Sequence, residues 1–285
     1  MTDKVLDYSG QLYLDLMKRS LTASIYDESG WSIIDTVEPV SKSPLQLLRS
    51  RVGTKLIEFL RRKSVVLVRR KASFNKEMRE EGKDWPIFGY TMAGHRRLDN
   101  VQMCVEDVIA NSVPGDFMET GVWRGGTVIL MRALLKAFQI NDRKVWAADS
   151  FEGLPVPKSK EDGSDLSKVD LLKVPLEKVQ ANFSKFDLLD DQVIFIKGWF
   201  CDTLPSCGVE RLSILRLDGD LYSSTMDALV NLYDKVSPGG YVIVDDYYSW
   251  PSCHQAVNDF LNDRSLDPEI VRIDWTGAYW KVPKD

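Results

Sequence analysis

The stretch Leu217-Asp218-Gly219-Asp220 ends one apolar run of the sequence, and the pair Asp245-Asp246 ends the next. A helix-length segment, residues 222–236, lies between them and is followed by Ser237-Pro238-Gly239-Gly240. A strand, a helix and a second strand in this order form a unit whose strands run parallel and end at the same edge of a sheet. The acids of both stretches are therefore expected to meet at the carboxyl edge, where open α/β sheets bind ligands.

Carboxylates that meet at one edge repel one another unless a cation or protons compensate their charge. Asp218, Asp245 and Asp246 supply hard oxygen ligands in the low number that Mg²⁺ prefers, which leaves positions for two hydroxyls of a substrate. Such an ion lowers the pKa of a hydroxyl and aligns its oxygen with an electrophile. Asp220 follows Asp218 closely and is our first candidate for the general base. The alternative is that Asp220 and Asp246 cap the following helices, which leaves Asp218 unexplained.

From Pro114 onward, apolar runs of strand length alternate with segments of helical periodicity. Strands are expected at 116–120, 144–148, 192–197 and the two acidic runs, and helices after residue 126 and at 171–186, 222–236 and 252–263. Two final runs, 269–275 and 278–282, are joined by Thr276-Gly277 and predict a hairpin. The pattern predicts an α/β fold with a doubly wound, seven-stranded Rossmann-like sheet, and the terminal antiparallel hairpin is typical of class I methyltransferases. Residues 153–170 predict an exposed polar loop over the carboxyl edge, of the kind that forms lids.

A glycine-rich turn, residues 119–126, follows the first of these strands. Its glycines let a ligand approach the backbone, and the N-terminus of the next helix favours negative groups. Glu119 predicts a cationic group nearby, such as the ammonium of an amino acid. Asp149 ends the second strand, where an acid binds the ribose diol of a nucleoside. The turn is not GxGxxG, which counts against a nicotinamide oxidoreductase. The alternatives are a turn without a ligand and an Asp149 that caps the next helix.

The composition is that of an ordinary globular protein, with 44% hydrophobic and 28% charged residues among 285. A net charge of −5 gives no reason to expect nucleic acid, and no run or leader predicts membrane insertion. Four cysteines without CxxC spacing predict free thiols of a cytoplasmic protein: Cys104, Cys201, Cys207 and Cys253. Of the two histidines, His254 is the better catalytic candidate because it follows Asp245-Asp246, and a surface or structural role is the alternative for His95 and His254 alike.

Several longer motifs resemble those of the macrocin-type O-methyltransferases. In chain order they are Thr91-Met92, Arg97-Leu98-Asp99-Asn100, residues 114–126, residues 149–155, Gly198-Trp199-Phe200 with Thr203-Leu204-Pro205, residues 218–222, and Asp245-Asp246-Tyr247. The resemblance covers roughly residues 90–282. It implies an enzyme of antibiotic or other natural-product biosynthesis that methylates a sugar hydroxyl, with S-adenosylmethionine as the methyl donor and Mg²⁺ as the metal.

The same resemblance assigns roles to single residues. The cofactor-binding residues that it implies are Thr91, Met92, Glu119, Thr120, Gly121, Val122, Trp123, Thr127, Asp149, Ser150, Phe151, Gly198, Trp199 and Asp218. Residues 119–123 hold the methionine part, Asp149 holds the ribose, and Ser150, Phe151 and Gly198-Trp199 surround the adenine. The implied metal ligands are Asp218, Asp245 and Asp246, with Asp220 as the base. A role for His254 stays open.

The chain is expected to divide into an N-terminal helical extension, residues 1–89, and a methyltransferase domain, residues 90–285. Residues 49–76 are markedly basic and carry interleaved apolar residues. They predict an amphipathic helix that rests on a membrane or an acidic partner, or a solvated helix that packs on the main domain or on a second copy in a homo-oligomer. The expected partner of the domain is a small hydroxylated acceptor. Alternatives to a sugar are a diol, a catechol or a polyketide hydroxyl, and the alternative to an enzyme is a cofactor-binding protein without turnover.

Overall fold

The computed structural model describes residues 6–25, 31–34, 44–70 and 76–283. The strands are β1 (Trp31–Ile33), β2 (Val68–Arg70), β3 (Asp116–Thr120), β4 (Val145–Asp149), β5 (Val193–Lys197), β6 (Leu212–Leu217), β7 (Val236–Val244), β8 (Val271–Arg272) and β9 (Ala278–Lys281). The α-helices are α1 (Tyr8–Leu21), α2 (Pro44–Arg62), α3 (Lys76–Glu80), α4 (His95–Ala110), α5 (Gly126–Ala137), α6 (Leu176–Lys185), α7 (Phe200–Thr203), α8 (Tyr222–Leu232) and α9 (Pro251–Asp263). Short 3₁₀ turns are η1 (Asp170–Leu172), η2 (Leu204–Ser206) and η3 (Tyr233–Lys235).

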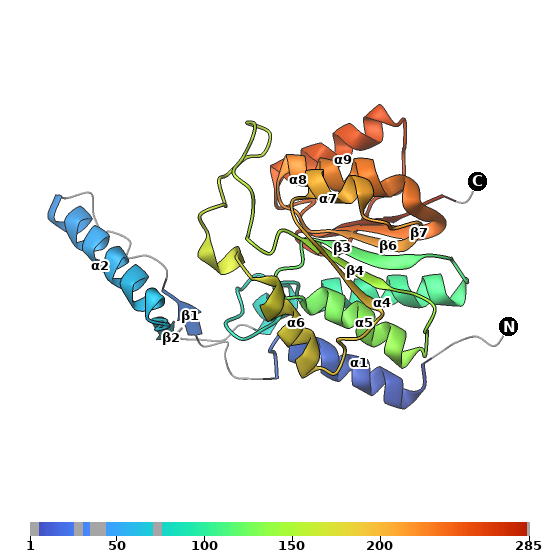
Figure 1. Cartoon of the computed structure of the whole chain (residues 1–285), viewed down its shortest axis with the longest axis horizontal. Coiled ribbons are helices and arrows are strands. Elements are labelled where there is room, and N and C mark those ends of the chain that lie inside the picture. The colour runs from blue at the N-terminus through green and yellow to red at the C-terminus, as the bar shows by residue number, and fades with distance from the viewer. Residues whose placement is uncertain (1–5, 26–30, 35–43, 71–75, 284–285) are drawn as a thin grey trace.

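Helices cover both faces of a central sheet (Figure 1). One layer holds α1, α4, α5 and α6, and the other holds α7, α8 and α9. Successive strand residues point to opposite faces. Phe117 and Ile214 therefore join the first buried layer, whereas Met118 and Leu215 join the second. The long apolar strands of the sequence are explained by this double burial.

The strand order of the main sheet is β5-β4-β3-β6-β7-β9-β8. Strands β3 to β7 are parallel, and β9 runs antiparallel to both of its neighbours. The order reverses between β3 and β6, and ligands of open α/β sheets bind at such a switch point. The doubly wound seven-stranded sheet and its terminal antiparallel hairpin are thus confirmed.

Strand β7 differs from its prediction because it begins at Val236 and includes the segment Ser237-Pro238-Gly239-Gly240. This segment is strand rather than the end of a helix because the pairing with β6 shifts register between Leu212 and Ile214. Gly240 fits beside β6 only without a side chain, since a Cβ there would lie 2.8 Å from the carbonyl oxygen of Ser213. Helix α8 correspondingly ends at Leu232.

The terminal hairpin has a longer connection than Thr276-Gly277, because β8 is confined to Val271–Arg272. Asp274 causes the difference. Its Oδ1 accepts the N–H groups of Thr276 at 2.9 Å and Gly277 at 2.8 Å, and its Oδ2 accepts a hydrogen bond from Arg97 Nε at 3.1 Å. A local side-chain turn of this kind competes with strand pairing. The predicted helix at 171–186 is also shorter, because Pro175 precedes the first residue of α6.

The N-terminal helices differ in how they contact the domain. Helix α1 buries Leu14, Met17 and Leu21 in the core that it shares with α4 and α5. Helix α2 stands apart from the sheet in Figure 1 and exposes an apolar stripe: Leu48, Val52, Leu56 and Phe59. The predicted basic helix therefore forms but ends at Arg62, and residues 71–75 of the basic segment lie outside the described residues. None of the described helices has the length and apolarity needed to cross a membrane.

Candidate active site

The turn after β3 is shaped by two glycines whose backbone would be strained with any other residue. Gly121 has φ +90°, and a Cβ there would lie 1.7 Å from the carbonyl oxygen of Asp218. Gly125 has φ +89° at the start of α5. Left-handed backbone of this kind is available to glycine without strain. The glycine-rich turn therefore brings the ends of β3 and β6 into direct contact.

Asp149 ties the end of β4 to this turn. Its Oδ2 accepts the N–H groups of Val122 at 2.6 Å and Trp123 at 3.2 Å, and its Oδ1 accepts the N–H of Phe151 at 2.7 Å. Burial raises the pKa of Asp149 above its ordinary value despite these donors. The carboxylate thus organises the turn as well as lining the cavity beside it.

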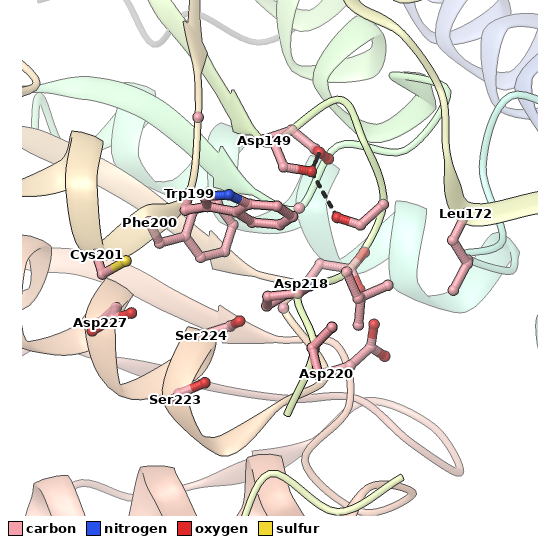
Figure 2. Close-up of a pocket in the computed structure, with 18 of the residues that line it drawn as sticks. Asp149, Leu172, Trp199, Phe200, Cys201, Asp218, Asp220, Ser223, Ser224 and Asp227 are labelled. Atoms are coloured by element: carbon pink, nitrogen blue, oxygen red, sulfur yellow. Dashed lines mark hydrogen bonds between the residues drawn. The ribbon is translucent and has the colours of Figure 1, made fainter. Parts of the chain in front are cut away.

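A cavity of about 420 Å³ opens over the carboxyl edge beside β3, β4 and β6 (Figure 2). Its volume lies in the range of small-molecule sites. Figure 2 shows Asp149 on one side of it, Asp220, Ser223 and Ser224 on the other, and the rings of Trp199 and Phe200 between them. The predicted cofactor residues that line it are Met92, Gly121, Trp123, Asp149, Ser150, Gly198, Trp199 and Asp218.

Other predicted cofactor residues lie behind this lining: Thr91, Glu119, Thr120, Val122, Thr127 and Phe151. Thr91 Oγ1 is 3.3 Å from Thr127 Oγ1, and the ring of Phe151 packs edge-on against Phe195. These residues lie behind the turn and do not line the cavity. Further lining residues had no predicted role of their own: Leu154, Pro155, Val156, Lys158, Cys201, Asp202, Ser223, Ser224 and Asp227. The first four were signalled by the long polar loop of residues 153–170, and the motif at 149–155 also includes Leu154 and Pro155.

The predicted acid cluster does assemble. Asp218, Asp245 and Asp246 each offer a carboxylate oxygen, and these oxygens all lie within 4.8 Å of one another. Asp246 Oδ2 is buried and has no hydrogen-bond partner among the described residues. Asp220 belongs to the same group of acids, and its backbone is held at φ +56° at the edge of the cavity. A non-glycine residue in this region is strained, as is common at functional sites.

Two buried arginines hold these acids: Arg216, which was not predicted, and Arg97, which was noted only as part of a motif. Arg216 contacts Asp218 Oδ2 at 2.7 Å and forms short ion pairs with Glu119 and Asp245. Arg97 pairs with Asp274 and with the second oxygen of Asp245. Glu119 therefore has a cationic neighbour from the protein itself, while its Oε2 is buried without a hydrogen-bond partner among the described residues.

The acids outnumber the arginines, and their pKa values reflect this. Burial raises the pKa of Glu119 to about 8. Burial and the neighbouring carboxylates raise the pKa of Asp218 to about 6 and of Asp220 to about 7, and hold that of Asp246 well above its ordinary value. Burial would also raise the pKa of Asp245, but Arg216 and Arg97 hold it below its ordinary value. The cluster is therefore deficient in positive charge at neutral pH.

His254 does not join this cluster. It lies on the exposed face of α9, outside the cavity lining, and its Nδ1 is 3.1 Å from the carbonyl oxygen of Tyr247. Its ring packs on that of Tyr247 at 4.5 Å between centroids. This position fits the alternative role as a surface residue, and the catalytic role of His254 stays a prediction. His95 lies at the start of α4, near Thr22 and Ser24.

The sheet order, the switch-point cavity and the acid cluster together define a class I methyltransferase, here an O-methyltransferase. The chain belongs to the Macrocin-O-methyltransferase (TylF) family, whose model matches residues 10–282. It is 42% identical to demethyldecarbamoylnovobiocin O-methyltransferase of Streptomyces niveus, across 98% of this chain and 97% of that protein. It is 51% identical to a Streptomyces olivaceus enzyme, 8-demethyl-8-(2,3-dimethoxy-alpha-L-rhamnosyl)-tetracenomycin-C 4'-O-methyltransferase. This similarity covers 70% of this chain and 78% of that enzyme.

The solved structure of the O-methyltransferase NovP superposes with a TM-score of 0.79 at 42% identity, over 96% of this chain and all of that one. The predicted resemblance to this family, the fold class and the class of O-methyltransferase are thereby confirmed.

Proposed function

We propose that the chain transfers the methyl group of S-adenosylmethionine to a hydroxyl of a sugar on a natural product, with Mg²⁺ held by Asp218, Asp245 and Asp246. The observation that carries this proposal is the convergence of three carboxylate oxygens within 4.8 Å beside a cavity of cofactor size. The acceptor class is supported by the 51% identical relative, whose name specifies a rhamnosyl group. A cytoplasmic location and a homo-oligomer stay predictions.

The donor set fits Mg²⁺. All three groups are carboxylates, which suit a hard cation, and Asp246 Oδ2, which has no hydrogen-bond partner in the described part of the chain, leaves an oxygen available. A bound Mg²⁺ supplies positive charge that lowers the pKa of a nearby substrate hydroxyl. Asp220 is suited to receive the proton of that hydroxyl, because it lines the cavity next to Asp218 and a bound cation would favour its ionised form. The aromatic rings of Trp199 and Phe200 line the same cavity and give it apolar surface.

The direct test is methyl transfer from S-adenosylmethionine to a rhamnosylated aromatic polyketide, compared with its aglycone and with a simple catechol. We expect product from the glycoside alone. A chelator is expected to abolish the reaction, and added Mg²⁺ to restore it, because the acid cluster needs a cation. Full activity in excess chelator would contradict the proposed metal site. Methylation of the aglycone or the catechol alone would contradict the proposal that the acceptor is a sugar hydroxyl. Cofactor binding by calorimetry without product from any acceptor would favour a protein without turnover.

The pKa shifts predict how metal-free stability depends on pH. Glu119, Asp218 and Asp220 have folded-state pKa values of about 8, 6 and 7, above those of an unfolded chain. The folded state therefore binds more protons than the unfolded state, so stability falls as pH rises from about 4 to 8. Asp245, whose pKa is lowered, loses its contribution only at more acidic pH. We expect Tm in a chelator to fall across this window and saturating Mg²⁺ to reduce the fall. Identical Tm profiles with and without Mg²⁺ would contradict this.

A further inference from the structure

The loop between β4 and α6 supplies one wall of the cavity. Leu154, Pro155, Val156 and Lys158 all line it, although this loop has no regular secondary structure before η1. The Nζ of Lys158 also reaches across to Cys201 Sγ at 3.8 Å. Something must hold so long a polar loop in place, because each ordered residue costs conformational entropy.

Within residues 153–170, Asp162 is the one buried residue, and only 1% of its surface is exposed. Its Oδ1 accepts the N–H of Ser223 at 2.7 Å, and its Oδ2 accepts the N–H of Lys158 at 2.8 Å. Burial would raise the pKa of Asp162, but these N–H donors hold it below its ordinary value. The carboxylate is therefore ionised at neutral pH and joins the loop to the start of α8.

Helix α8 needs this contact. Leu221, which precedes its first residue, offers no side-chain cap, so a first-turn N–H would lack a partner from its own segment. A carboxylate at a helix N-terminus is favoured by both the free N–H groups and the helix dipole. Asp162, which is distant in sequence, supplies that cap.

The contact also lies beside the proposed base. Helix α8 begins two residues after Asp220, and Ser252 at the start of α9 donates from Oγ to the carbonyl oxygen of Asp220 at 3.0 Å. A Cβ at Gly163 would lie 3.7 Å from the same Ser252 Oγ. The tip of the loop therefore rests where α8, α9 and Asp220 meet.

We propose that Asp162 is a positioning residue that anchors the loop of residues 153–170 to the N-terminus of α8 and thereby fixes the wall of the cavity formed by Leu154, Pro155, Val156 and Lys158. The consequence for ligand binding rests on the proposed function, because the cavity is taken to hold the cofactor. The anchoring itself does not rest on it, since it is a property of the protein without ligand.

The test compares Asp162→Ala, Asp162→Asn and Asp165→Ala in the full chain. Asp165 is an exposed acid of the same loop, and among the described residues its carboxylate hydrogen-bonds or pairs with its neighbours Ser167 and Lys168. Trypsin cleavage after Lys160, followed by mass spectrometry on ligand-free protein, reports whether the loop is held. Calorimetry with S-adenosylhomocysteine and the KM for S-adenosylmethionine report whether the wall is held.

We expect Asp162→Ala to be cleaved after Lys160 about tenfold faster and to bind S-adenosylhomocysteine about tenfold more weakly, as for loss of a helix cap. Asp162→Asn keeps one acceptor oxygen, so its cleavage rate and its affinity should fall between those of Asp162→Ala and the natural protein. Asp165→Ala should match the natural protein.

Equal cleavage of Asp162→Ala and the natural protein would overturn the anchoring. Faster cleavage with unchanged affinity and KM would overturn the role in fixing the wall. Failure of the natural protein to bind S-adenosylhomocysteine would instead contradict the proposed function, and the cleavage rates would then decide the anchoring alone.

Discussion

Asp218→Asn is expected to lower kcat/KM for methyl transfer by about 10³-fold, which corresponds to several kcal/mol of lost transition-state stabilisation. Of the three proposed metal ligands, all described residues, Asp218 alone lines the cavity, so its charge serves both the proposed metal and the reacting hydroxyl. Asparagine keeps the shape of the side chain and removes only the negative charge. The measurements are steady-state kinetics and, independently, Mg²⁺ binding by calorimetry, which should weaken in parallel.

Asp234→Asn is the matched control, because Asp234 is an exposed acid that pairs with Arg264. It should leave both the kinetics and Mg²⁺ binding unchanged. If Asp218→Asn kept full activity, the proposed metal site would be wrong. If it lost activity but bound Mg²⁺ normally, Asp218 would act on the acceptor or cofactor rather than as a metal ligand.

Most of the sheet could be predicted because its strands and helices differ in the period of their apolar residues. The runs that become β3, β4 and β6 are buried on both faces and lie close to their predicted positions. The start of β7 could not be predicted from local preference, because Pro238 and two glycines resemble a turn. Their place in a strand depends on the register shift against β6 and the close approach to Ser213, which only the assembled sheet contains.

The residues of the candidate site likewise divide into those that could be predicted from the sequence and those that could not. Asp149, Asp218, Asp245 and Asp246 could be found because each follows a strand, and topology alone brings such residues to one edge. Arg216 could not, because it lies inside an apolar run and its partners Glu119 and Asp245 come from other strands.

Asp162 looks like its exposed neighbour Asp165 in the sequence. The difference between them is a contact with the N–H of Ser223, which is distant in the chain. The role of a residue can be predicted from the sequence when it depends on the position of that residue at the end of a strand. It cannot be predicted when it depends on a partner that is distant in the chain.

Arg216→Met is expected to lower the free energy of unfolding by about 3–5 kcal/mol, measured by urea denaturation in a chelator. The guanidinium of Arg216 is fully buried and contacts Glu119, Asp218 and Asp245, and methionine fills similar space without compensating their charge. The acids would then take up protons or expose the cluster to water. Adding Glu119→Gln to Arg216→Met should restore part of the lost stability, because one of the uncompensated carboxylates is removed.

Arg211→Met is the control for Arg216→Met, because Arg211 is exposed just before the same strand. Its replacement should change the free energy of unfolding by less than about 0.5 kcal/mol. An Arg216→Met protein as stable as the natural one would mean that protons, and not arginines, compensate the buried acids.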